Sequence, residues 1–450
     1  MKVLLLSTYE LGRQPFGLAS PAAWLRQAGA EVTCLDLSRD SLREDAVRDA
    51  GLVAFYVPMH TATRMAARAA ARVRKLNPKA HLCFYGLYAP VNESYLRQLG
   101  ADTVLGGEFE QGMVNLFHHL SAGKNGGSQT EPVISLGRQK FMAPDRRGLP
   151  DLRRYAHVHA ADGRRLTAGY TEASRGCKHL CRHCPIVPVY HGAFRVVQRD
   201  VVLEDIRRQV GSGAEHITFG DPDFFNGIGH AMALVEAVHR EHPWLTYDVT
   251  TKIEHLLKHA RHLPTLRDTG CLFVTSAVES LDDRVLFLLE KGHTRADFLR
   301  VVETFREIGL VLNPTFVTFT PWTTLEGYCG LLRTLAALDL VDNVAPIQLA
   351  IRLLIPAGSR LLELEEVQRL VDPFEEAALC YPWRHPDPRV DHLCEQLQNL
   401  VARSDDNRRA LFASVWNLAH QAAGIPAPAL PRAGHLSRAE IPYLNEPWYC

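Results

Sequence analysis

Three cysteines, Cys177, Cys181 and Cys184, constrain this 450-residue chain more than any other feature. They lie in the loop Glu-Ala-Ser-Arg-Gly-Cys-Lys-His-Leu-Cys-Arg-His-Cys-Pro at residues 172–185, directly after a strand-like run at residues 166–170. Three thiols at this spacing can hold one iron–sulfur cluster and leave one iron open to another ligand. The loop therefore predicts a 4Fe–4S site that takes part in chemistry rather than a closed electron carrier.

A structural zinc site is the main alternative, with His179 or His183 as the fourth ligand. Zinc sites usually combine two Cys/His knuckles, and no second knuckle follows in this sequence. Ten cysteines spread over 450 residues are too sparse for the disulfide framework of a small secreted protein. The cluster is favoured, and a non-catalytic zinc or redox thiol protein using the same cysteines remains the alternative.

The composition is that of an ordinary globular protein, and we expect its thiols to be reduced. Lys plus Arg and Asp plus Glu both number 50, so no overall field attracts nucleic acid or a membrane. The apolar start at residues 1–7 is too short for a signal peptide, and no apolar run approaches the length of a membrane span. We expect a cytoplasmic location and neither a membrane nor a nucleic-acid partner.

Alternating strand-like and helix-like segments predict an α/β chain with two units. Residues 1–120 alternate in the manner of a doubly wound, Rossmann-like parallel sheet. Residues 121–149 contain a Gly/Ser-rich run and are expected to be a linker. Strand-like runs at residues 166–170, 216–219, 246–250, 271–277, 313–319 and 345–354 predict a partial (β/α)6 barrel over residues 150–358. Residues 359–450 are predicted to form a helical C-terminal extension.

The strand followed by a Gly-containing CxxxCxxC loop resembles the radical S-adenosylmethionine (SAM) superfamily. In that superfamily the methionine end of SAM fills the open iron position. The resemblance implies a 4Fe–4S cluster on Cys177, Cys181 and Cys184, and reductive cleavage of SAM to a 5′-deoxyadenosyl radical. It also implies an unknown substrate at the open end of the barrel and an electron donor such as a flavodoxin or ferredoxin.

Other residues of the cysteine loop carry further expectations. His183 stands where the superfamily usually has an aromatic residue, which implies a contact with adenine; simple loop filling is the alternative. Lys178, His179 and Arg182 place positive charge where it would ease reduction of an anionic cluster.

Polar residues at the ends of later strands are implied contacts of SAM. The run Gly-Asp-Pro-Asp at residues 220–223 stands where the superfamily has a Gly-Gly-Glu-like element for the SAM ammonium, so Asp221 and Asp223 are candidates, with turn capping as the alternative. Lys252 is a candidate for the SAM carboxylate, with a solvated lysine as the alternative. Arg352, on the sixth predicted strand, could reach the SAM carboxylate or the substrate.

A second specific match is the run Val-Glu-Ser-Leu-Asp-Asp at residues 278–283, followed by Lys-Gly-His-Thr at residues 291–294. It resembles a Glu-Ser-Gly-Ser and Lys-Gly element of the superfamily, which implies that Glu279 binds the SAM ribose and that Ser280 caps the next helix. A carboxylate suits a ribose diol, and a purely capping role is the alternative for Ser280. Phe319 and Trp322 correspond to an element that packs on adenine, with core packing as the alternative.

The first 120 residues resemble the cobalamin-binding domain that precedes many radical SAM barrels. They lack the Asp-x-His-x-x-Gly signature that gives a His to cobalt, and residues 8–17 contain no His. Two interpretations fit this pattern. The domain could bind cobalamin without giving a ligand to cobalt, or it could be a structural relic that no longer binds cobalamin. With cobalamin, methyl transfer to carbon is the implied reaction; without it, oxidation, rearrangement or sulfur chemistry.

The chain stops at Trp-Tyr-Cys450, and its layout resembles the CUAEP/CCAEP-tail radical SAM family. Members of that family end in Cys, then Cys or selenocysteine, then Ala-Glu-Pro. Our hypothesis is that a selenocysteine codon was read as a stop; the alternative is that Cys450 is the true end and its thiol incidental. The intact mass of protein from its native host, supplied with selenium, tests this hypothesis.

Overall fold

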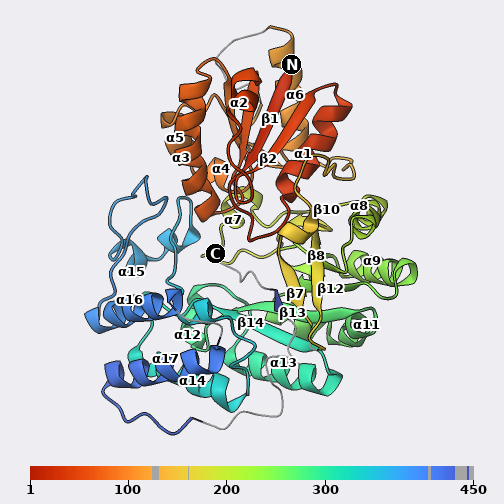
Figure 1. The fold of residues 1–450 in the computed structure, drawn as a ribbon. Helices are drawn as coiled ribbons and strands as arrows, with labels where there is room; N and C mark the ends of the chain where they lie inside the picture. Colours follow the sequence, from red (N-terminus) through yellow and green to blue (C-terminus); the bar gives the residue numbers. More distant parts are fainter. Residues whose placement is uncertain (124–130, 161, 404–406, 431–442, 445–450) are drawn as a thin grey trace.

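The computed structural model describes residues 1–123, 131–160, 162–403, 407–430 and 443–444. Figure 1 shows two α/β units, with the C-terminal helices α15 (Glu365–Gln368), α16 (Pro388–Ala402) and α17 (Arg408–Ala423) beside the second unit. The order predicted from the sequence, a Rossmann-like sheet, a barrel-like unit and a helical extension, is confirmed.

The first unit is a parallel sheet in the order β2-β1-β3-β4-β5-β6. Its strands are β1 (Lys2–Ser7), β2 (Glu31–Asp36), β3 (Leu52–Tyr56), β4 (His81–Tyr85), β5 (Thr103–Gly107) and β6 (Ile134–Ser135). Its helices are α1 (Phe16–Gln27), α2 (Glu44–Asp49), α3 (His60–Leu76), α4 (Tyr88–Val91), α5 (Glu93–Gln98) and α6 (Glu110–Ser121). The strand order reverses beside β1, which places a crevice at the carboxyl ends of the strands.

Both faces of this sheet are covered because its strands carry apolar residues at successive positions. In β1, Leu4 and Leu6 pack together with Val73 of α3. Val3 and Leu5 pack on the opposite face, against α1 and α6. Continuous apolar runs in the sequence therefore become strands buried on both sides.

Part of the segment predicted as a linker packs against both units. Ile134 and Ser135 add β6 to the first sheet, and Phe141 belongs to the core of the second unit. The Asp145 carboxylate lies 3.0 Å from the Arg26 guanidinium of α1. Residues 124–130, which hold most of the Gly/Ser-rich run, lie outside the described residues.

The second sheet has the order β14-β13-β12-β11-β8-β7-β15. Its strands are β7 (His157–His159), β8 (Arg165–Thr171), β11 (His216–Phe219), β12 (Thr246–Thr250), β13 (Cys271–Glu279), β14 (Val311–Phe316) and β15 (Tyr443–Leu444). The strands from β8 to β14 are parallel, whereas β7 is antiparallel to β8 and to β15. A separate hairpin, β9 (Ser174–Gly176) and β10 (Phe194–Val196), flanks the cysteine loop.

Helices connect the strands of this second unit. They are α7 (Val187–Tyr190), α8 (Arg199–Gly211), α9 (Ile228–Glu241), α10 (Ile253–Lys258), α11 (Leu263–Asp268), α12 (Asp283–Leu288), α13 (Arg295–Ile308) and α14 (Leu325–Ala337). Short 3₁₀ turns are η1 (Leu152–Arg154), η2 (Phe224–Gly227), η3 (Ala260–His262), η4 (Pro346–Leu349) and η5 (Arg360–Glu363). The predicted strands near residues 166, 216, 246, 271 and 313 are all present.

The sixth predicted strand, residues 345–354, is wrong as a strand. Residues 346–349 form the turn η4, and only one parallel bridge, between Phe319 and Arg352, continues the sheet beyond β14. Pro346 opens the segment and has no N–H to donate to a neighbouring strand, so the apolar run cannot pair along its length.

The C-terminal extension completes the core of the second unit. Leu397 of α16 and Val415 and Trp416 of α17 belong to the same buried cluster as the barrel strands, and Figure 1 shows α17 beside α14. Within the described ranges, no helix combines the length and apolar character that crossing a membrane requires. Cys450 lies outside the described residues.

Candidate functional site

The cysteine loop leaves the hairpin strand β9 at Gly176 and returns through α7. Gly176 has φ 73°, and a Cβ there would lie 2.4 Å from the Tyr190 ring and 2.5 Å from the Ala193 carbonyl oxygen. Only glycine fits this approach. Cys177 and Cys181 are 8% and 6% exposed, and the loop tightens where the Cys184 N–H donates to the Cys181 carbonyl at 3.1 Å.

The three thiols suit a cluster better than a single zinc ion. Burial raises the pKa of Cys177, and it raises that of Cys184 to about 12, so a bound metal would be needed to hold them as thiolates. Among the described residues, the one group of His, Cys, Asp and Glu ligand atoms within 4.8 Å of one another does not include these thiols. Four ligands of one zinc ion would lie closer together than that.

Glu279 joins the end of β13 to the cysteine loop. Its Oε1 accepts from Lys291 Nζ at 3.1 Å and lies 3.2 Å from His183 Nε2. Burial by itself would raise the pKa of Glu279, but Lys291 and His183 hold it well below the usual range. The loop therefore faces an ionised carboxylate, and His183 contacts Glu279 instead of only filling the loop.

Lys291 is a site residue that the sequence analysis does not predict, although it opens the Lys-Gly run at residues 291–292. It is 3% exposed; burial lowers the pKa of Lys291, but the Glu279 carboxylate, with smaller effects of Cys181 and Cys184, raises it above the usual value. The expectation that Lys178 and Arg182 ease reduction of a cluster stays a prediction, although both side chains have other partners. Lys178 Nζ donates to the Asn226 carbonyl at 2.6 Å, and Arg182 pairs with Glu290 at 2.6 Å.

Asp221 ties the end of β11 to the segment before the cysteines. Its two carboxylate oxygens accept from Ser174 Oγ at 2.5 Å and from the Ala173 N–H at 2.9 Å. Burial raises its pKa to about 7 despite these donors. Asp223 is fully buried, and its Oδ1 caps η2 by accepting from the Phe225 N–H at 3.2 Å, as the capping alternative anticipates.

Lys252 and His293 lie beside the Glu279 pair. Lys252 is 7% exposed, so it is not the solvated lysine of the alternative interpretation; its Nζ lies 3.4 Å from Glu254 Oε2. Neither ring nitrogen of His293 has a hydrogen-bond partner. Burial, with Lys291 and Lys252 nearby, lowers the pKa of His293 to about 4, which leaves a neutral imidazole in the site.

Two expected roles do not hold in the structure. Ser280 does not cap α12, because Asp282 does so by accepting from the Arg284 N–H at 2.8 Å; Ser280 Oγ only accepts from the Asp282 N–H at 3.0 Å. The Arg352 guanidinium donates to Asp391 of α16 at 2.6 Å and to the Trp383 carbonyl at 2.7 Å. These partners direct Arg352 to the C-terminal extension, because the segment that carries it leaves the sheet after one bridge.

A cavity of about 280 Å³ adjoins the end of β13. Glu279, Ser280 and Trp322 line it, together with Thr324 and Tyr328. Phe319 is fully buried and stacks on Tyr328 with ring centroids 5.1 Å apart, which is core packing. The cavity is close to the lower size limit of small-molecule sites.

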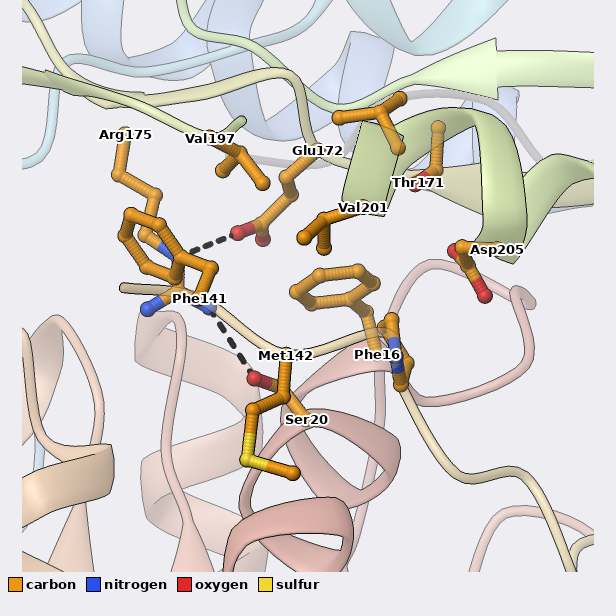
Figure 2. A pocket seen from close by; sticks show the side chains of 12 residues that line it. Phe16, Ser20, Phe141, Met142, Thr171, Glu172, Arg175, Val197, Val201 and Asp205 are labelled. Carbon is orange, nitrogen blue, oxygen red and sulfur yellow. Dashed lines mark hydrogen bonds and ion pairs between the residues drawn. The ribbon is translucent and has the colours of Figure 1, made fainter. Parts of the chain in front are cut away.

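A buried ionic cluster joins the two units. Figure 2 shows the Arg175 guanidinium bonded to Glu172 and directed toward Ser20 of the first unit. The same guanidinium lies 2.7 Å from Glu110 and 3.4 Å from Glu108. The adjacent cavity holds about 10 Å³, room for about one water molecule.

Aromatic side chains gather at the carboxyl ends of β3, β4 and β5 in the first sheet. The rings of Tyr56, Tyr85 and Phe109 lie with centroids 5.4, 6.2 and 5.0 Å apart. A Cβ at Gly17 would lie 2.2 Å from the Tyr56 ring, so the loop after β1 closes over it. That loop, described over its whole length, has no His. That loop therefore offers no imidazole to a cobalt ion.

Residues 171–323 match the radical SAM superfamily. The chain is 25% identical over 323 residues to the hopanoid C-3 methylase of Methylococcus capsulatus, covering 69% of this chain and 62% of that protein. It is 26% identical over 203 residues to the ribosomal protein uS12 methylthiotransferase RimO of Parabacteroides distasonis, covering 41% of this chain and 46% of RimO. The chain thus spans less than two thirds of either relative.

Solved structures share the fold over most of the chain. The methyltransferase TsrM from Kitasatospora setae, with cobalamin and a [4Fe-4S] cluster bound, has a TM-score of 0.61 at 16% identity, covering 97% of this chain and 92% of TsrM. The radical enzyme OxsB with aqua-cobalamin bound has a TM-score of 0.66 at 12% identity, covering 94% of this chain and 71% of OxsB. The match over residues 171–323 makes this segment similar to a radical SAM domain, and the likeness to TsrM and OxsB concerns the fold.

Proposed function

We propose that this enzyme cleaves SAM reductively on a cluster held by Cys177, Cys181 and Cys184 and directs the 5′-deoxyadenosyl radical at a substrate in the open end of the barrel. The observation that carries the proposal is the tight loop of buried thiols facing the Glu279–Lys291 pair. When bound, the cluster would supply the electron that breaks a carbon–sulfur bond of SAM.

The chain's own residues would bind and shield SAM. Glu279, held ionised, would accept from the ribose hydroxyls, and His183 would fix the orientation of that carboxylate. Lys252 would pair with the SAM carboxylate beside the neutral His293. Because both oxygens of Asp221 are already used, the SAM ammonium would be met by main-chain carbonyls at the end of β11 rather than by this side chain.

Anaerobic reconstitution tests the proposal. We expect about four irons per chain and formation of 5′-deoxyadenosine on reduction in the presence of SAM. Cys181→Ala should lose both properties, whereas Cys380→Ala, which changes a partly buried cysteine outside the loop, should keep them. A colourless zinc protein that forms no nucleoside would instead support the non-catalytic alternative.

Methyl transfer with cobalamin is the second candidate function. It is favoured by the likeness to the hopanoid C-3 methylase and by whole-chain fold likeness to TsrM and OxsB. Incubation with hydroxocobalamin followed by gel filtration distinguishes methyl transfer from the other reaction types. A corrin spectrum that co-elutes with the protein supports methyl transfer. Its absence leaves oxidation, rearrangement or sulfur chemistry.

Membership of the CUAEP/CCAEP-tail group is a finer proposal, supported by the sequence layout alone. The intact-mass measurement with selenium supplied tests it separately from the radical chemistry, since the mass of the chain is measured without cluster assembly.

A further inference from the structure

Three side chains from three segments of the second unit meet beside the cysteine loop. His179 comes from the loop itself, Asp223 from the turn after β11, and His255 from α10. Asp223 Oδ2 lies 2.7 Å from His255 Nδ1 and 3.4 Å from His179 Nε2. Among the described residues, this is the one group of at least three His, Cys, Asp or Glu ligand atoms within 4.8 Å of one another.

None of these three converging atoms makes a hydrogen bond, despite their short separations. Asp223 is fully buried and His255 is 7% exposed, so water does not compensate the missing bonds. A buried polar atom without a partner costs free energy, and buried charges are normally paired or bound to a metal. Lone pairs that converge on one point, rather than N–H groups aimed at an oxygen, are the geometry of metal ligands.

The surroundings hold this arrangement in place. Asp223 Oδ1 is fixed by the Phe225 N–H at 3.2 Å, which leaves Oδ2 directed to the two imidazoles. The rings of His179 and His255 pack edge to face with centroids 4.7 Å apart. The other nitrogen of His179, Nδ1, lies 3.7 Å from Glu254 Oε2, and a carboxylate behind a ligating His is a common outer partner of metal sites.

We propose that His179, Asp223 and His255 bind one divalent first-row metal ion such as Zn²⁺ or Fe²⁺, at a site separate from the cluster thiols. Two imidazoles and one carboxylate suit such ions and leave further positions open. Because His179 stands between Cys177 and Cys181, the ion would tie the cysteine loop to β11 and to α10. This site goes beyond the proposed reaction and does not depend on it.

The test uses the anaerobically reconstituted full chain, dialysed against Co²⁺ as a spectroscopic probe. We expect one cobalt per chain in addition to about four irons, with visible bands of nitrogen and oxygen ligands and no thiolate-to-cobalt charge transfer. His255→Ala and Asp223→Asn should abolish the stoichiometric cobalt. His259→Ala, which removes a neighbouring His outside the group, should retain it.

A second chain, Cys177→Ala/Cys181→Ala/Cys184→Ala, keeps the test independent of the cluster. It should bind one cobalt, and adding His179→Ala, a change at a partly exposed loop position, should abolish that binding. In the chain that keeps all three cysteines, cobalt bound without any iron cluster supports the metal site and counts against the proposed reaction. Failure to bind cobalt, or binding unchanged in the His255, Asp223 and His179 variants, overturns the proposal.

Discussion

Lys291 donates a hydrogen bond of 3.1 Å to Glu279, and the two residues are only 3% and 8% exposed. Glu279 has φ 67°, a left-handed conformation that is uncommon outside glycine and costs about 1–3 kcal/mol. Its side-chain partners hold it there, at the end of a barrel strand and beside the thiols. This pair is the structural link between the sheet and the cysteine loop.

Glu279→Gln keeps the shape of the side chain and removes its charge. We expect SAM binding to the reconstituted enzyme to weaken by about 10- to 100-fold, because hydrogen bonds to charged groups contribute roughly 1.5–3 kcal/mol. Isothermal titration with SAM measures this change. Glu290→Gln, a change in a more exposed ion pair, is the control. Equal affinities in the two variants would remove Glu279 from the SAM site.

Lys291→Met removes the buried positive charge beside Cys181 and Cys184. The reduction potential of the cluster should become more negative, on the order of tens of millivolts, since net charge around a cluster sets its potential. A redox titration followed by electron paramagnetic resonance measures the shift. In Lys178→Met, whose Nζ is bound to the Asn226 carbonyl, the potential should stay close to that of the wild type. The same shift in both variants would contradict this role of Lys291.

Arg175→Leu leaves the carboxylates of Glu108, Glu110 and Glu172 without their shared cation. Removing one partner from a buried ion cluster costs about 3–5 kcal/mol, so the midpoint of urea unfolding should fall clearly. Arg147→Leu breaks a pair on an arginine that is 78% exposed, so the midpoint of urea unfolding should stay close to that of the wild type. Similar losses in the two variants would show that the interface cluster contributes little.

Glu108→Gln tests a pH dependence. Burial is the main cause that raises the pKa of Glu108 from 4.5 to about 7, although Arg175 opposes it. A carboxyl group with a raised folded pKa stabilises the fold below about pH 4.5, and this contribution is lost as the pH rises through about 7. The wild type should therefore lose stability relative to Glu108→Gln between pH 5 and 8 in urea unfolding. Parallel curves for the two proteins would contradict the raised pKa.

The cysteine spacing, the strands from β8 to β14 and the motif around Glu279 could be predicted because each depends on neighbouring residues in the chain. The capping role of Ser280 was wrong because Asp282 lies near the same helix end, and only the path of the backbone decides which of the two side chains caps α12. The expectation for Arg352 failed because its partners lie at Trp383 and Asp391, far along the sequence.

The sequence by itself determined that three thiols lie in one loop after a strand, because the CxxxCxxC spacing brings them together whatever lies around them. Tertiary structure alone decided which charges face that loop. Lys291 approaches Cys181 and Cys184 while Lys178 and Arg182, nearer in sequence, turn to other partners. It also brought His179, Asp223 and His255 together from three segments. Such convergence depends on packing between elements, which periodicity and spacing do not encode.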